Sequence, residues 1–310
     1  MKPIHTGNEF EKLNEIFQTI SQFAFAFNSD VDSLLGDDCA IIDGAGQNID
    51  LFASDLMAEG IHFSRLYYTP AEIGYKSISV NVSDIAAMGG MPRYVTIAIA
   101  CPKDFDITNF YVGVKAACQE YNLRVAGGDL SSSENLFVSV AILGSSIGQP
   151  IKRSTATVND HIFLTGPTGA SAAGLELLQQ DPSSSGPLQR SHKLPKARVD
   201  AAAVIARLPA NSAIDVSDGL IGDLNHICTQ SNLGAVIETM PAAEGATLEH
   251  CMYGGEDYEI IFTHPNPELV MESFSEQNIS LPIVIGRFRE TKGILYRNKP
   301  LVVKGYAHDL

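Results

Sequence analysis

The segment from Asn81 to Gly90, NVSDIAAMGG, is the sequence feature that most restricts how this chain can fold. Ile78, Val82 and Ile85 recur at the spacing of one face of an α-helix, which predicts a helix that the closing glycine pair terminates. Asp84 falls inside that helix, between apolar neighbours. Because burying an isolated carboxylate is costly, this position requires a partner, such as a cation.

Other carboxylates occupy similar positions, at the ends of apolar runs and beside glycine or serine. They are Asp37 and Asp38 in GDDCAII, Asp55 in ASD, Asp129 in GGD, and Asp215 and Asp218 in IDVSDG. Two like charges 4 Å apart repel by about 1 kcal/mol in water and by about 4 kcal/mol at an effective dielectric constant of 20. Oxygen-rich sites suit Mg²⁺, which relieves that repulsion. The pattern therefore predicts a magnesium-dependent phosphoryl-transfer enzyme.

Composition limits the partners and the compartment of this protein. A net charge of −15 over 310 residues does not favour nucleic acid or an anionic membrane as a partner. The polar N-terminus lacks a signal-peptide core, and no apolar run of about 18 residues suggests a membrane span. The five cysteines are scattered without a CxxC pair, which argues against a zinc site and fits a reducing compartment. We expect a soluble cytoplasmic protein.

The order of the predicted elements indicates an α/β or α+β fold with two domains, 1–148 and 149–310, divided at GQPIKRS. Helices are expected at 9–27, from Pro70 through Asp84, at 110–121, after the turn at 166–169 as far as residue 178, at 196–207 and at 220–230. Strands are expected at 49–54, 94–101, 123–126, 136–147, 161–165, 213–216 and 258–263. The tail beyond them is expected to alternate short strands and turns.

Single motifs leave their roles open. Ser217 or Asp218 fits the N-cap of the following helix, and IDVSDG is no EF-hand, because the twelfth position is His226 instead of glutamate. The GGD triplet, Gly127 to Asp129, suits either close approach to a phosphate or a tight turn. Neither a P-loop nor a dinucleotide fingerprint is present. His62, Arg153 and Glu256 each fit a ligand contact or an ordinary surface or turn position.

Taken together, eight segments resemble the thiamine-monophosphate kinase family, within the superfamily of aminoimidazole ribonucleotide synthetase and selenophosphate synthetase. They occur in order between residues 36 and 306: GDDCAII, ASDLMAEGIHF, NVSDIAAMGGMP, GGD, TG with SAAGL, AIDVSDGL, GGEDYE and KGY. Eight segments in order form a far more specific match than any one motif.

The resemblance implies a two-domain fold whose N-terminal α/β domain binds ATP and Mg²⁺. Its strands pair with a second subunit as a dimeric β-barrel, and a C-terminal α/β domain follows. It implies direct in-line transfer from ATP to thiamine monophosphate, giving thiamine diphosphate, with no catalytic nucleophile or general base. The implied Mg²⁺ ligands are Asp38, Ser54, Asp55, Asp84, Asp129, Asp215 and Asp218. The implied ATP contacts are Tyr111, Gly128, Asp129, Arg153 and Ser217, and the implied substrate contacts are His62, Glu256 and the position of Val303.

Two departures from the family pattern concern these contacts. Ala53 stands where the family often has Ser or Thr, so a backbone carbonyl or water must replace that oxygen. Val303 stands where the family carries an aromatic residue, and the chain has no Trp, which makes Tyr306 a candidate substitute.

Two alternatives remain at this stage. One is another ATP-dependent synthetase of the superfamily, although the N-terminus lacks the catalytic Cys or Lys pattern of a selenophosphate synthetase. The other is a non-catalytic metal- or ligand-binding relative, against which the retained acidic positions argue.

Overall fold

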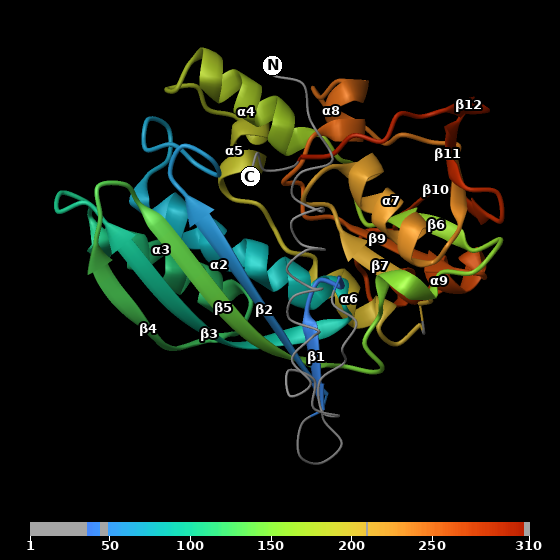
Figure 1. The fold of residues 1–310 in the computed structure, drawn as a ribbon, viewed down its shortest axis with the longest axis horizontal. Helices are drawn as coiled ribbons and strands as arrows, with labels where there is room; N and C mark the ends of the chain where they lie inside the picture. The colour runs from blue at the N-terminus through green and yellow to red at the C-terminus, as the bar shows by residue number, and fades with distance from the viewer. Residues whose placement is uncertain (1–35, 44–48, 209, 307–310) are drawn as a thin grey trace, which may run out of the picture.

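The computed structural model describes residues 36–43, 49–208 and 210–306, so the helix expected at 9–27 lies outside the described residues. Two β-sheets lie side by side, the first built from the N-terminal half and the second from the C-terminal half (Figure 1). Within the described part of the chain, every helix is too short or too polar to traverse a lipid bilayer.

The first sheet has five strands in the order β1-β2-β5-β3-β4. Its strands are β1 (Ala40–Asp43), β2 (Ile49–Ala58), β3 (Gly90–Cys101), β4 (Arg124–Ser132) and β5 (Phe137–Ser146). The β3–β4 pair is parallel and the other neighbours are antiparallel. β4 therefore forms the edge farthest from β1 and β2.

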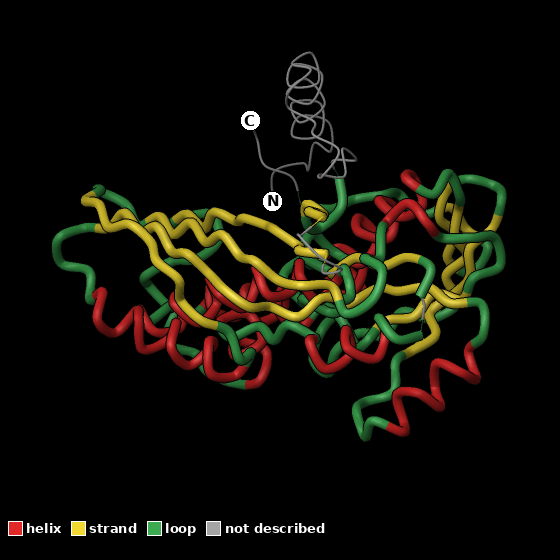
Figure 2. Tube along the Cα trace, turned by 90° about the horizontal axis from the view of Figure 1, so that it is seen from below, coloured by secondary structure: helices red, strands yellow, loops and turns green. Residues whose placement is uncertain are grey.

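Two helices, α2 (Pro70–Ala87) and α3 (Ile107–Glu120), lie on one face of this sheet, and no described helix covers the other face (Figure 2). Thr69 and Glu72 form a capping box that begins α2, and Pro70 occupies its first turn. The two helices pack with backbones in near contact, because a Cβ on Gly74 would meet the Phe110 carbonyl oxygen at 2.1 Å. This tight packing fixes α2, and with it Asp84, against the sheet.

The second sheet has seven strands in the order β12-β11-β8-β10-β6-β9-β7. They are β6 (His161–Leu164), β7 (Ser212–Asp215), β8 (Gly234–Ile237), β9 (Ile260–His264), β10 (Ile283–Arg289), β11 (Gly293–Tyr296) and β12 (Lys299–Pro300). The helical elements of this half are η1 (Arg153–Thr155), α4 (Ala170–Gln180), α5 (Pro187–Lys193), α6 (Val199–Ile205), α7 (Leu220–Gln230), α8 (Leu248–Tyr253) and α9 (Pro267–Glu276).

The second sheet is buried on both faces at β7 and β9: every residue of these strands is buried, and successive side chains of a strand point to opposite faces. Ile261 belongs to the core beside α7, whereas its neighbour Phe262 belongs to the core beside α6 and α9. Phe262 stacks between Phe163 and Phe274, with ring centroids 5.0 and 5.8 Å apart. The second of these cores also contains Ala86 of α2, which ties the two halves of the molecule together.

Several element predictions were wrong in extent. β2 continues through Asp55 to Ala58, and β4 runs through the GGD triplet, which is a paired strand segment instead of a turn. α6 is shorter than the expected 196–207, and the tail contains the helix α9 in addition to strands. The helix expected at 220–230 is confirmed as α7.

Candidate active site

A cavity of about 400 Å³ lies between α2 and the loops of the second half of the chain. The sequence-predicted residues that line it are Asp55, His62, Asp84, Asp215, Ser217, Asp218 and Glu256. Lys76, Val80 and Asp84 of α2 also line it, and their spacing of four places them on one helix face. Cavity residues that are far apart in the sequence thus meet beside this one face of α2.

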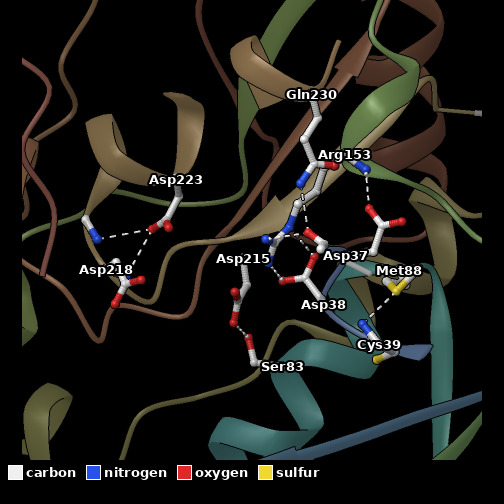
Figure 3. A network of polar contacts seen from close by, with 12 residues as sticks. Asp37, Asp38, Cys39, Ser83, Met88, Arg153, Asp215, Asp218, Asp223 and Gln230 are labelled. Carbon is white, nitrogen blue, oxygen red and sulfur yellow. Dashed lines mark hydrogen bonds and ion pairs between the residues drawn. The ribbon is translucent and has the colours of Figure 1, made fainter. Parts of the chain in front are cut away.

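Three carboxylates converge at one end of the cavity, which two of them, Asp84 and Asp215, line. Asp38, Asp84 and Asp215 each offer an oxygen atom within 4.8 Å of the others. Asp38 precedes β1, Asp84 lies in α2, and Asp215 ends β7. Ser83 donates a 2.6 Å hydrogen bond to Oδ2 of Asp215, which joins α2 to the second sheet (Figure 3). Three of the acids that the sequence analysis singled out thus lie together.

Burial and mutual repulsion disfavour the ionised forms of Asp84 and Asp215. Burial raises the pKa of Asp84 well above its usual value, and the neighbouring Asp55, Asp215 and Asp38 raise it further. Burial likewise raises the pKa of Asp215, with Asp38 adding to the effect. A bound divalent cation would stabilise the ionised carboxylates, which burial and the neighbouring acids otherwise disfavour.

Arg153 holds one member of the cluster. Its Nη2 atom lies 2.9 Å from Oδ1 of Asp38 and its Nε atom 3.3 Å from Oδ2, an arrangement that engages both carboxylate oxygens (Figure 3). Its backbone N–H donates to Asp37 at 2.8 Å. The guanidinium is therefore positioned beside the carboxylates, where a phosphate could also accept from it.

The turn before α7 is held by a side chain that belongs to α7 itself. Gly219 occupies the N-cap position without a side-chain cap, so neither Ser217 nor Asp218 caps this helix as one reading of the sequence suggested. Instead, Oδ2 of Asp223 accepts hydrogen bonds from the backbone N–H groups of Asp218 and Gly219, both at 3.1 Å (Figure 3). Asp223 thereby orients the turn that carries two cavity residues.

The other end of the cavity contains a buried ion pair that the sequence did not reveal. Nζ of Lys76 lies 2.7 Å from Oε1 of Glu256, and Nδ1 of His192 lies 3.2 Å from Oε2. Burial lowers the pKa of His192 to about 2, with Lys76 contributing, so this imidazole is neutral at physiological pH. Lys76 is therefore the counter-ion of Glu256.

The two adjacent acids of GGEDYE, Glu256 and Asp257, have different roles. Glu256 faces the cavity, whereas Asp257 accepts from the backbone N–H groups of Gly169 and Ser171 and so satisfies the N-terminus of α4. Gly255 permits this arrangement, because a Cβ there would meet the Ser217 carbonyl oxygen at 2.4 Å. The glycines of this motif bring two loops together at the cavity.

Comparison with known proteins places the chain in a family. AIR synthase related protein matches through its N-terminal domain at residues 36–146 and its C-terminal domain at 157–296. Thiamine-monophosphate kinase of Aquifex aeolicus is 35% identical over 298 residues, 89% of this chain and 92% of the relative. The corresponding protein of Bacillus subtilis is 33% identical over 307 residues, 91% and 94% of the two chains. The chain belongs to the thiamine-monophosphate kinase family.

A solved structure of AaThiL complexed with AMPPCP and TMP matches the whole fold of this member of the thiamine-monophosphate kinase family. Its TM-score is 0.86 at 31% sequence identity, and the match covers 99% of this chain and 100% of that chain. The two-domain α/β expectation is thereby supported at the level of fold.

Some residues that the thiamine-monophosphate kinase pattern assigns to ligands lie outside the cavity. Asp129 and Gly128 lie on β4, three strand spacings from β2, which is about 14 Å. Ser54 is exposed and points to the uncovered face of the sheet, opposite to Asp55. Tyr111 is exposed on α3.

The C-terminal tail brings tyrosine to the cavity. Val303 is partly buried and packs against the core beside α7, and it is not among the cavity-lining residues. Tyr306 and Tyr253 line the cavity instead. The backbone N–H of Tyr306 donates to the Asp218 carbonyl at 3.0 Å, which fixes the tail beside the turn before α7.

Proposed function

We propose that this chain transfers the γ-phosphoryl group of ATP to the phosphate of thiamine monophosphate, giving thiamine diphosphate. The observation that carries the proposal is the carboxylate cluster of Asp38, Asp84 and Asp215 at one end of a cavity whose other end holds His62 and Glu256. The similarity to AaThiL complexed with AMPPCP and TMP supports the choice of both substrates.

Mg²⁺ is the proposed cofactor, and the donor set fits it, since clustered carboxylate oxygens are its preferred protein ligands. We propose that Asp38, Asp84 and Asp215, with Asp55 and Asp218 nearby, would hold the ions, and that Ser54 and Asp129 would complete the set. When bound, the cation neutralises charge on the phosphates during transfer. Arg153 and Ser217 are the proposed phosphate contacts of this chain.

Transfer should proceed in one step. The phosphate of the acceptor is ionised near neutral pH, so its own oxygen serves as the nucleophile and no general base is required. Positioning and charge stabilisation dominate such reactions. The protein groups therefore bind, orient and shield the two phosphates without forming a covalent intermediate.

We propose a homodimer formed through the uncovered face of the first sheet. Phe52, Leu56, Tyr94 and Phe137 share that face by strand register and are exposed, Leu56 by 55%. Contiguous exposed apolar surface of this kind is typical of an interaction site. Closure of two such sheets into a barrel would also remove the exposed edge strand β4.

The dimer proposal accounts for the residues that lie outside the cavity. Ser54 and Asp129 both point to the uncovered face but belong to strands about 14 Å apart within one subunit. Pairing of two sheets face to face would bring Asp129 of the partner subunit toward Ser54. Gly128 and Tyr111 are also proposed ATP contacts.

The proposed domain division is 1–148 for ATP and Mg²⁺ binding and dimerisation, and 149–310 for the C-terminal α/β domain. A cytoplasmic location is also proposed, and the five free cysteines fit its reducing conditions.

A coupled assay of ADP release, with and without thiamine monophosphate, tests the function. We expect release that depends on the acceptor and on Mg²⁺, with thiamine diphosphate as the product. Release without the acceptor would favour another ATP-dependent synthetase, and no release with any acceptor would favour a non-catalytic binding protein.

A further inference from the structure

Lys76 is a fully buried lysine at the acceptor end of the cavity. Its relative exposure is 0%, and it lines the cavity from the same face of α2 as Asp84. Lysine is almost never fully buried unless it is paired. A buried ammonium group must therefore be compensated by acceptors supplied by the fold.

The ammonium group of Lys76 has three donors, and three acceptors of the protein surround it. Nζ lies 2.7 Å from Oε1 of Glu256, 3.1 Å from the Tyr68 hydroxyl and 3.2 Å from the His62 carbonyl oxygen. Because a lysine can donate only three hydrogen bonds, no donor remains for a substrate phosphate. Lys76 consequently acts on a ligand through its protein partners.

Two of these partners are the residues assigned to the acceptor substrate. His62 lies in the loop after β2, and Glu256 lies in the loop before β9. Glu256 has φ = +64°, a left-handed conformation that is strained for a side-chain-bearing residue and persists only where surrounding contacts enforce it. The ion pair with Lys76 is such a contact, and it fixes one loop relative to the other.

The ion pair also changes what Glu256 offers to a ligand. A bare glutamate would attract the cationic thiazolium ring by charge alone, as the sequence suggested. Because Lys76 neutralises it, Glu256 presents oriented acceptor oxygens of little net charge. Recognition then depends on the direction of the carboxylate, which Lys76 determines.

We propose that Lys76 is a positioning residue that sets the affinity for thiamine monophosphate by orienting Glu256 and the main chain at His62. This inference rests on the proposed function. Its effect should be confined to the acceptor, because Asp84 and Asp215 line another part of the cavity, and Asp38 and Arg153 are not among the lining residues.

Steady-state kinetics of Lys76→Met, which keeps the length of the side chain but not its charge, test the proposal. We expect the KM for thiamine monophosphate to rise by about tenfold or more, and the KM for ATP to stay within about twofold. The dissociation constant of thiamine monophosphate, measured by calorimetry with a non-hydrolysable ATP analogue, should rise in parallel. Lys196→Met is the matched control, because it removes a 3.6 Å lysine–glutamate pair with Glu120 outside the cavity and should leave both KM values unchanged.

A double-mutant cycle separates positioning from general destabilisation. If Lys76 acts through Glu256, Lys76→Met combined with Glu256→Gln should be no worse than the weaker-binding single variant, within about twofold. Multiplied losses, an unchanged acceptor KM, or an equal rise in both KM values would overturn the proposal. If Lys76→Met does not fold, Lys76→Gln provides the same comparison, and failure of both to fold would mark Lys76 as structural. Absence of thiamine monophosphate turnover by the wild-type chain would instead refute the proposed function.

Discussion

Asp84 has opposite consequences for activity and for stability. It shares a 4.8 Å cluster with Asp38 and Asp215, which is the proposed Mg²⁺ site for phosphoryl transfer. Asp84→Asn should lower kcat by at least about a hundredfold, because the loss of a cation ligand costs several kcal/mol in the transition state. Single-turnover assays at several Mg²⁺ concentrations measure this loss, and near-normal turnover at ordinary Mg²⁺ would disprove the role.

The same substitution should stabilise the metal-free protein in a pH-dependent way. The pKa of Asp84 is raised in the folded state by burial and by neighbouring acids, so the folded protein binds this proton more tightly than the unfolded chain does. The stability gained from that proton is present at low pH and is lost as pH rises through the folded pKa. In EDTA, the Tm of Asp84→Asn relative to wild type should therefore increase between about pH 5 and pH 8. A constant or falling difference would contradict this account.

The tail residues Val303 and Tyr306 should respond differently to substitution. Val303→Trp should lower the Tm without tightening the acceptor, because Val303 packs against the core and a larger side chain overpacks it. Tyr306→Ala should raise the KM for thiamine monophosphate up to about tenfold, the scale of a lost aromatic contact. Parallel KM and Tm measurements distinguish the two. A tighter acceptor in Val303→Trp at unchanged Tm would reverse the assignment.

Motifs located most of the cavity residues, but partners distant in sequence were not predictable. Asp84, Asp215 and Glu256 stand in segments whose composition signals unusual chemistry. Lys76 carries no such signal, because a lysine in a helix usually extends into solvent. Its spacing of eight from Asp84, on one helix face, was the available clue. Identifying its partner requires the fold, since Glu256 lies in the other half of the chain.

At the level of elements, the turn before α7 depends on one side chain. Asp223→Ala would leave two backbone N–H groups without their acceptor, so the free energy of unfolding should fall by about 1–3 kcal/mol. It should also raise the Mg²⁺ concentration for half-maximal activity, because Asp218 shifts with the turn. Asp223→Asn keeps an acceptor oxygen and serves as the control. Denaturant unfolding and Mg²⁺ titrations test both effects, and equal behaviour of the two variants would exclude this hydrogen-bonding role.

Element types were predicted better than element ends. The apolar spacing of α2 and α7 and the β-branched run of β3 identified these elements from sequence. β4 was predicted as a short strand followed by a turn, because its glycines favour turns in isolation. Pairing with β3 extends the strand through them. Tertiary pairing thus overrode local propensity, because the glycines of β4 lack the side chains from which a strand is recognised in sequence.

At the level of the whole molecule, the proposed dimer predicts complementation between inactive subunits. If each site uses its own Asp84 and Asp129 of the partner subunit, an equal mixture of Asp84→Asn and Asp129→Asn chains should regain about a quarter of wild-type activity, because half of the dimers are mixed and each contains one intact site. The mixture must be unfolded and refolded together so that subunits exchange. Activity no greater than the sum of the separate variants would place Asp129 in its own subunit's site or outside any site.

The stripe of α2 that lines the cavity also fixes a length. Lys76 and Asp84 both line the cavity, at its proposed acceptor and phosphate ends, and at 1.5 Å per residue their separation along the helix axis is about 12 Å. An α-helix cannot stretch without breaking its hydrogen bonds, and α2 is clamped against α3 by glycine contacts. With the proposed substrate placement, we expect this fixed separation to select substrate length. Thiamine without a phosphate should fall short of the transferring group, and thiamine diphosphate should extend past it.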